Sequence, residues 1–379
     1  MTRLALAAAA LVLAACTGPT GPAGAEGTHE TSAGPVEVTR VIDGFEVPWA
    51  VAFLPDGGFL VTERPGRLTH VAGGTRRLVA GLPAVHAAGQ GGLLDVAVAR
   101  DFARSREIFL TYAEPRGGGT AATALAAARL NAAGDALEDV RVLWRMQPAT
   151  GSGQHFGARV VEAPDGTLFV TTGDRGDRDA AQDLTNHIGT IVRINRDGSV
   201  PGDNPFADAP TARSDIWSWG LRNIQGAAIG RDGALWTVMH GPRGGDEVNH
   251  HGTPGLNYGW PLQSFGVEYV SRRQVGTPGP VEGVTDPLFW WEASPAVSGL
   301  AIYSGRLFPE WQGDLLVGAL QHDTIIRLTG DAAGVEEAER LLEGAYRRIR
   351  DVREAPDGSI WFIAETEGAI YRMAPAGGS

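Results

Sequence analysis

Polar residues recur at one position relative to the turns of this chain. His155, Arg222 and Arg347 each stand ten residues before a turn aspartate, at positions 165, 232 and 357. Histidine titrates near neutral pH and can serve as a general base, and several guanidinium groups at one place suit an anionic ligand that carries carboxylates. Loop ends are polar in any protein, so each residue alone could be ordinary surface. Their common register favours a shared pocket.

Two further features extend this chemistry. His155 with Asp174 suits a general base that is held by a carboxylate, and Gly241 and Pro242 offer backbone carbonyls, the oxygen ligands that Ca²⁺ prefers. The sequence has no His/Cys cluster with zinc spacing, no P-loop, and no Rossmann glycine fingerprint after a strand. A Ser-His-Asp triad cannot be argued from spacing. The pattern indicates a base and several guanidinium groups around one cavity, with a place for calcium.

The elements that must position these residues are six repeats. Each repeat is a strand of alternating apolar residues, a turn that is usually Asp-Gly, and a second apolar strand. One such hairpin cannot bury its apolar face alone, whereas radial repetition stacks the sheets face to face. We therefore predict an all-β fold, a six-bladed β-propeller with four-stranded antiparallel blades; a β-sandwich would require six chance resemblances. The hairpins span residues 49–62, 92–112, 157–172, 225–238, 298–317 and 350–364, and 335–342 is expected to be an outer strand.

The repeat also predicts where the polar residues meet. The first strand of each hairpin runs away from one face of the ring and the second returns to it. Residues just before the first strand and just after the second therefore gather at a single channel mouth. They are Gln90, Gln154, His155, Arg222, Asn223 and 347–350 on one side of the hairpins, and Glu63, Arg64, Gly173, Asp174, 240–242 and Glu365 on the other.

Composition and charge limit the possible partners. The 379 residues are 43% apolar and include 53 glycines and 23 prolines, which favours many short strands joined by turns. The formal net charge of -12 repels phosphate backbones and disfavours nucleic acid as a partner.

The N-terminus has the pattern of a targeting segment. Arg3 precedes an apolar run, residues 4–15, that is too short to span a bilayer comfortably, and the run ends Leu-Ala-Ala before Cys16. This resembles a bacterial lipoprotein signal with Cys16 as the lipidated residue; an ordinary secretory signal is the alternative. We expect a signal peptide over 1–15, a flexible tether over 16–36 and a single propeller domain over 37–375. The protein would be exported, periplasmic or at the cell surface, with the membrane reached only through this anchor.

Taken together, the motifs resemble those of the soluble, pyrroloquinoline quinone (PQQ)-dependent glucose and aldose sugar dehydrogenases. The resemblance extends from Val47 to Val352, and the order and spacing of its motifs make it specific. It implies an oxidoreductase that uses PQQ and Ca²⁺ to oxidise a small sugar, with an electron acceptor that the sequence does not identify. The motifs lie at residues 89–94, 155–159, 173–176, 220–226, 240–247 and 257–261.

The resemblance also implies residue roles. His155 would take the proton from the anomeric hydroxyl of the sugar while hydride passes from that carbon to the quinone. Ca²⁺ on the carbonyls of Gly241 and Pro242 would polarise the quinone carbonyl. Arg222 would act on the developing charge, and Asp174 would orient the imidazole. Cofactor contacts are implied for Asn223, His240, Tyr269, Gln321, Arg348 and Arg350, substrate contacts for Gln90 and Asp174, and a second, structural calcium for Glu247 and the backbone of Tyr258.

Three departures from the family pattern stand out. Gln321 occupies the position at which the glucose dehydrogenases place a cofactor-binding lysine, and His240 replaces a cofactor-binding glutamine. One residue is inserted around 250–252, between Glu247 and Tyr258. These changes fit the broader aldose sugar dehydrogenase branch better than the glucose-specific one; a relative that has diverged from both is the alternative.

Two other functions stay open from the residues alone. A calcium-dependent propeller lactonase would need carboxylates and asparagines around a channel metal, whereas this mouth is richer in arginine. A non-catalytic, surface-anchored binding propeller would leave His155 and Arg350 dispensable.

Overall fold

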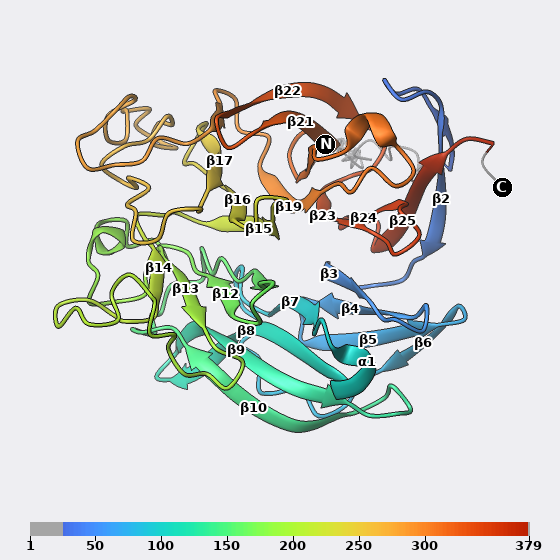
Figure 1. Ribbon diagram of the computed structural model, residues 1–379, viewed down its shortest axis with the longest axis horizontal. Helices are drawn as coiled ribbons and strands as arrows, with labels where there is room; N and C mark the ends of the chain where they lie inside the picture. Colours follow the sequence, from blue (N-terminus) through green and yellow to red (C-terminus); the bar gives the residue numbers. More distant parts are fainter. Residues whose placement is uncertain (1–25, 378–379) are drawn as a thin grey trace, which may run out of the picture.

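The computed structural model describes residues 26–377, which form six antiparallel sheets around a common centre (Figure 1). The predicted six-bladed propeller is confirmed. The first three blades are β3 (Pro48–Phe53), β4 (Phe59–Glu63), β5 (Arg67–Ala72) and β6 (Thr75–Leu78); β7 (Leu93–Val98), β8 (Glu107–Gly117), β9 (Thr120–Leu130) and β10 (Leu137–Arg145); and β11 (Val160–Glu162), β12 (Leu168–Thr171), β13 (Ile191–Ile194) and β14 (Ile216–Ser218).

The other three blades complete the ring. They are β15 (Ile224–Ile229), β16 (Leu235–Met239), β17 (Asp246–His250) and β18 (Phe289–Trp291); β19 (Val297–Ile302), β20 (Leu315–Ala319), β21 (Thr324–Asp331) and β22 (Gly334–Leu341); and β23 (Ile349–Glu354), β24 (Ile360–Ala364) and β25 (Ala369–Pro375) with β2 (Val36–Ile42) and β1 (Gly27–His29). The expected outer strand near 335–342 is β22. Each innermost strand contacts that of the next blade, in the order β3, β7, β11, β15, β19, β23 and back to β3.

Helical segments are short. Those of the described residues are α1 (Phe102–Ser105) and the 3-10 turns η1 (Asp179–Gln182) and η2 (Pro309–Trp311). Between residues 26 and 377 no helix has the length and apolar character needed to cross a membrane.

The sixth blade joins the two ends of the propeller. Strand β2 pairs antiparallel with β25, and Val36 and Val38 of β2 are fully buried. This corrects the expected tether over 16–36, because Gly27–His29 pairs with β2 as a fifth strand and Val36 already belongs to the core. Alternating apolar residues in β2 need a buried face, and the open edge of β25 provides it. Residues 16–25, including Cys16, and the expected signal peptide lie outside the described residues.

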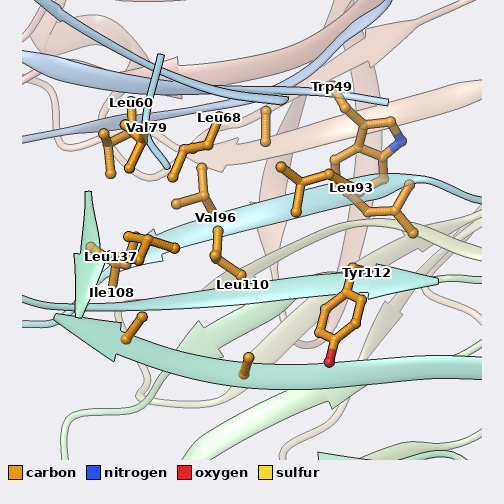
Figure 2. Close-up of a cluster of buried hydrophobic side chains, with 14 of the residues drawn as sticks. Trp49, Leu60, Leu68, Val79, Leu93, Val96, Ile108, Leu110, Tyr112 and Leu137 are labelled. Atoms are coloured by element: carbon orange, nitrogen blue, oxygen red, sulfur yellow. The ribbon is translucent and has the colours of Figure 1, made fainter. Parts of the chain in front are cut away.

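Apolar side chains fill the space between neighbouring blades. Figure 2 shows one such cluster, in which Trp49, Leu60 and Leu68 of the first blade face Leu93 and Leu110 of the second. Each is at most 4% exposed. Burial of a large apolar side chain contributes roughly 1.5–3 kcal/mol, so a blade is stabilised mainly by its two neighbours.

The hairpin turns share one side-chain contact. In four of the blades the turn aspartate accepts the backbone N–H of the residue two positions later, at 2.9–3.1 Å. Asp side chains favour turns through this bond. These turns hold the first two strands of a blade in register. The start of the first strand and the end of the second strand therefore lie together at the end of the hairpin away from the turn.

An ion-pair cluster lies among the innermost strands. Arg159 is 3.2 Å from Asp95 and 3.1 Å from Asp351, and Arg353 is 3.0 Å and 2.9 Å from the same two carboxylates. Each carboxylate also accepts a backbone N–H from the following blade. The cluster therefore ties the second, third and sixth blades together beneath the predicted channel mouth.

Candidate active site

His155 and Asp174 are brought together by the first hairpin of the third blade. His155 precedes β11 and Asp174 follows β12, so the antiparallel pair places both at one end. The imidazole Nδ1 lies 2.5 Å from Oδ1 of Asp174, which is 1% exposed. A carboxylate can only accept, so Nδ1 carries the proton and Nε2 keeps its lone pair. The imidazole is therefore arranged to accept a proton at Nε2.

Asp174 is held in its ionised form. Gly176 N–H donates to Oδ1 at 2.8 Å, and the indole Nε1 of Trp260 donates to Oδ2 at 2.9 Å. Burial opposes ionisation of this carboxyl, but the hydrogen bond and charge of His155, this backbone N–H and the charge of Arg222 together hold the pKa of Asp174 below its usual value. A fixed carboxylate at this place sets both the tautomer and the orientation of the imidazole.

The backbone around His155 is closely constrained. Its φ of 53° lies in the left-handed region, which a residue with a side chain adopts only when its surroundings enforce it. The His155 N–H donates to Oε1 of Gln90 at 2.8 Å. A Cβ at position 173 would lie 2.2 Å from the carbonyl oxygen of His155, so Gly173 is required for this approach. The second blade and the Gly173 backbone thus position the imidazole of His155.

Arg222 shares a partner with Asp174. Its guanidinium carbon lies 5.3 Å from the ring centre of Trp260, the residue that donates to Asp174, and its Nη1 donates to the His240 carbonyl at 3.2 Å. The Arg222 Nε is buried without a hydrogen-bond partner in the structure. A buried donor of this kind costs about 1–3 kcal/mol unless a ligand or water satisfies it.

The sixth blade contributes two more guanidinium groups. Arg348 and Arg350 donate to different oxygens of Glu365, at 2.8 and 2.7 Å, and Arg350 also donates to Oε1 of Gln225 at 3.1 Å. Burial lowers the pKa of Arg350, and the charge of Glu365 opposes this effect. Two guanidinium groups share one carboxylate, so this wall carries an excess of positive charge.

Two cavities meet at His240. Its Nε2 hydrogen-bonds the Val297 carbonyl at 2.7 Å; burial lowers the pKa of His240 to about 4, with Arg222 and Arg350 adding to the effect and Asp246 opposing it. The smaller cavity, about 150 Å³, is walled by Arg64, Gln90, Asn223, Gln225, Arg348 and Arg350 among others. The larger, about 870 Å³, is walled by Gly241, Pro242, Tyr269 and Gln321 among others.

The predicted calcium ligands Gly241 and Pro242 lie in the wall of the larger cavity. Gly241 N–H donates to Oδ1 of the buried Asp246 at 3.0 Å. The hydroxyl of Tyr269, a residue that is 59% exposed, donates to the Pro242 carbonyl at 3.1 Å. The loop of Gly241 and Pro242 is thus held by the buried Asp246 on one side and by the partly exposed Tyr269 on the other.

The second predicted calcium pair lies away from these cavities. Burial raises the pKa of Glu247 to about 8, and Asn249 Nδ2 donates to its carboxylate at 3.2 Å while Asn249 Oδ1 is buried without a partner. The Tyr258 hydroxyl donates to the His250 carbonyl at 2.5 Å. Among residues 26–377, no three His, Cys, Asp or Glu side chains are grouped so as to hold a metal ion.

In the sixth blade, the position ten residues before the turn aspartate does not lie in the site, so the prediction of Arg347 is wrong. Arg347 is exposed and lines neither cavity, whereas Arg348 and Arg350 line the smaller one. The backbone at Arg348 has a φ of 53°, and the β23–β24 register shifts between Ile349 and Asp351. These irregularities redirect the side chains, which a uniform count cannot anticipate.

Some residues of the site could not be predicted from their position at the ends of strands. Trp260, which links Asp174 to Arg222, comes from a loop of the fourth blade that has no repeat pattern. Gln225 could have been found, because it is a polar residue in an otherwise apolar inner strand. The same signal marks Asp95 of the ion-pair cluster.

Known proteins resemble the chain along most of its length. Residues 45–372 match the family described as Glucose / Sorbosone dehydrogenase. The aldose sugar dehydrogenase YliI of Escherichia coli is 42% identical over 346 residues, which cover 90% of this chain and 93% of the relative.

Solved structures of sugar dehydrogenases share the fold of this chain. The apo form of a soluble aldose sugar dehydrogenase from Escherichia coli matches with a TM-score of 0.86 and 42% identity, over 90% of this chain and 99% of the other. The PQQ-bound form of an aldose sugar dehydrogenase from Streptomyces coelicolor matches with a TM-score of 0.74 and 25% identity, over 89% and 98%. The family match and the 42% identity together assign this chain to the glucose/sorbosone dehydrogenase family of oxidoreductases.

Proposed function

We propose that this protein oxidises aldose sugars at the anomeric hydroxyl, with PQQ as the electron-accepting cofactor and Ca²⁺ as its Lewis acid. The observation that carries the proposal is the His155–Asp174 pair, with a proton-accepting Nε2, beside a cavity rich in guanidinium groups. The relatives named for aldose sugar oxidation, one of them bound to PQQ, support the same reaction.

The donor set fits these two ligands. PQQ carries carboxylates, and Arg348 and Arg350 in the cavity wall are only partly neutralised by Glu365. The buried Arg222 Nε has no hydrogen-bond partner within residues 26–377 and would find an acceptor in a bound anion. The carbonyls of Gly241 and Pro242 supply hard oxygen ligands for Ca²⁺.

The protein's own residues account for the proton transfer. His155 accepts the proton of the anomeric hydroxyl at Nε2, and the carboxylate of Asp174 stabilises the resulting imidazolium through Nδ1. Arg222 lies next to this pair and offers positive charge to negative charge that develops on the reacting oxygens. When bound, the quinone supplies the acceptor for two electrons and the anomeric hydrogen, polarised by Ca²⁺. The sugar leaves as a lactone, having lost two hydrogens.

A second calcium would fit Glu247. A carboxylate whose pKa is raised by burial, next to an amide oxygen without a partner, is an environment that a cation would stabilise. The predicted backbone ligand at Tyr258 belongs to the same blade. We propose a structural role for this ion, distinct from the ion at Gly241 and Pro242.

The test is reconstitution of the full chain. The protein is mixed with PQQ and Ca²⁺, then given glucose and other aldoses with an artificial electron acceptor. We expect dye reduction, and loss of most turnover in His155→Gln with cofactor binding retained, because the base acts on the substrate. The control is His86→Gln, since His86 lines neither cavity and its ring makes no hydrogen bond with residues 26–377. No cofactor binding and no dye reduction would reject the proposal, and lactone hydrolysis without an acceptor would favour the lactonase.

We also propose export with a lipid anchor at Cys16. The support is the short apolar run that ends at this cysteine, the only one in the chain. Labelled palmitate should be incorporated into the protein in a bacterial host and lost in Cys16→Ser. A soluble, unlabelled parent protein would indicate an ordinary secretory signal.

A further inference from the structure

Arg64 is fixed at the channel mouth by its backbone. It follows β4, its N–H donates to the Val47 carbonyl at 3.0 Å, and its carbonyl accepts the N–H of Leu93 at 3.2 Å. A Cβ at position 92 would lie 2.1 Å from the Arg64 carbonyl oxygen and 2.4 Å from its Cγ, so Gly92 packs directly on the side-chain stem. The residue therefore occupies a defined place between the first and second blades.

The guanidinium of Arg64 has no partner within residues 26–377. No hydrogen bond, ion pair or ring contact joins it to another side chain there, although the residue is only partly exposed and lines the smaller cavity. The adjacent carboxylate of Glu63 is engaged by Arg67 at 2.9 Å and by the N–H of Glu46 at 2.6 Å. Arg348 and Arg350, the other arginines in the wall of the smaller cavity, are both bonded to Glu365, so Arg64 is the cation of this wall that has no such bond among the described residues.

The charges in the cavity wall do not balance. Arg64, Arg348 and Arg350 line the cavity, none of its lining residues is acidic, and the Glu365 carboxylate behind it compensates only one of the three positive charges. Neutral hydroxyl groups would not offset such an excess, whereas carboxylates form paired hydrogen bonds with guanidinium groups. The wall is therefore suited to a ligand with more than one negative charge.

We propose that Arg64 is a cofactor-binding residue that pairs with a carboxylate of the quinone cofactor, in the same cavity as the arginines of the sixth blade. The inference rests on the proposed PQQ-dependent function. The neutral Gln321 in the larger cavity leaves arginines to supply the positive charge at the mouth. Arg64 would thus contribute affinity for the cofactor.

The test measures cofactor binding without turnover. PQQ is titrated into the Ca²⁺-loaded full chain, and Kd is followed by absorbance or calorimetry at several salt concentrations. Arg64→Gln should raise Kd by about 10- to 100-fold, the range for loss of a charge-assisted hydrogen bond. Its Kd should also depend less steeply on salt, because one ion pair is missing. Arg64→Lys should recover part of the affinity.

The control is Arg347→Gln, which removes the same charge from an exposed residue near the mouth that lines neither cavity. It should change Kd less than about twofold. A thermal midpoint of Arg64→Gln within about 3 °C of the parent shows that the fold is intact. If the parent binds PQQ and Arg64→Gln binds equally well, with the same salt dependence, the inference about Arg64 is wrong and the proposed function stands. If the parent does not bind PQQ, both are wrong.

Discussion

Replacement of Asp174 by asparagine should damage both catalysis and stability, to an extent that the structure allows us to estimate. Three donors reach this carboxylate: His155 Nδ1 and the Gly176 N–H at Oδ1, and Trp260 Nε1 at Oδ2. An asparagine side chain offers one oxygen and one NH₂ group, so at least one of the donors loses its acceptor. If the asparagine oxygen faces His155 and Gly176, both of these donors keep an acceptor. The NH₂ group then faces the indole N–H of Trp260, which is the one donor left without an acceptor.

The two effects have different magnitudes. One buried donor left without an acceptor costs about 1–3 kcal/mol of unfolding free energy. In catalysis, the imidazolium that forms loses its charged partner and keeps a neutral one. A charge-assisted bond exceeds a neutral one by about 1–2 kcal/mol, which corresponds to roughly 5–30-fold in kcat/KM. The opposite amide orientation would direct an NH₂ toward Nδ1 and impair the base further.

Two assays on the same protein preparations would check the estimate. Initial rates are measured with aldose, electron acceptor, PQQ and Ca²⁺, and unfolding free energies by urea titration. Asp208→Asn serves as the control because this aspartate is exposed and its side chain makes no hydrogen bond or ion pair within residues 26–377. A kcat/KM within twofold of the parent would show that the carboxylate does not support the base.

The pH dependence of stability offers an independent check on Asp174. Its pKa is lowered in the folded protein, so its contribution to stability is present above the usual value of 3.8 and is lost as the pH falls through the lowered pKa. The stability difference between the parent and Asp174→Asn should therefore shrink in acid, and a difference that grows below pH 3.8 would contradict the assignment.

Three further changes test other parts of the structure. In calcium-free protein the pKa of Glu247, raised to about 8, should make stability fall as the pH rises from 4.5 to 8; Glu247→Gln should remove this dependence of stability on pH in thermal scans, and an unchanged dependence would show that another group causes it. Arg159→Met leaves the buried carboxylates of Asp95 and Asp351 with Arg353 as their remaining shared cation, so one buried negative charge is uncompensated. This change should lower the unfolding free energy by about 3–5 kcal/mol in urea titrations, and a loss below about 1 kcal/mol would contradict the reasoning. Gly173→Ala places a Cβ 2.2 Å from the His155 carbonyl oxygen and should reduce turnover in a variant that remains folded by circular dichroism; full activity would show that the loop can relax.

Much of the architecture could be predicted because strand patterns are local. Alternating apolar residues and Asp-containing turns identify the hairpins, and each hairpin must cover its neighbour to bury its apolar face. His155 and Asp174 could be paired for the same reason, since they are the two ends of one hairpin. The composite sixth blade was harder to predict, because β2 pairs with β25, a strand more than 300 residues away in sequence, and β1 joins that sheet only through β2.

Local sequence patterns are therefore enough to identify the six hairpins, the end at which their polar residues gather, and the pairing of His155 with Asp174. Which side chains line the cavities there depends on contacts between distant parts of the chain. Trp260 reaches Asp174 across 86 residues, from a loop without periodicity. Arg348 and Arg350, not Arg347, turn inward because the backbone departs from a regular strand. Among the described residues, Arg64 has no side-chain partner, and the neighbouring Glu63 is engaged by Arg67. Periodicity fixes the face of a strand, whereas long-range partners depend on how the ring closes.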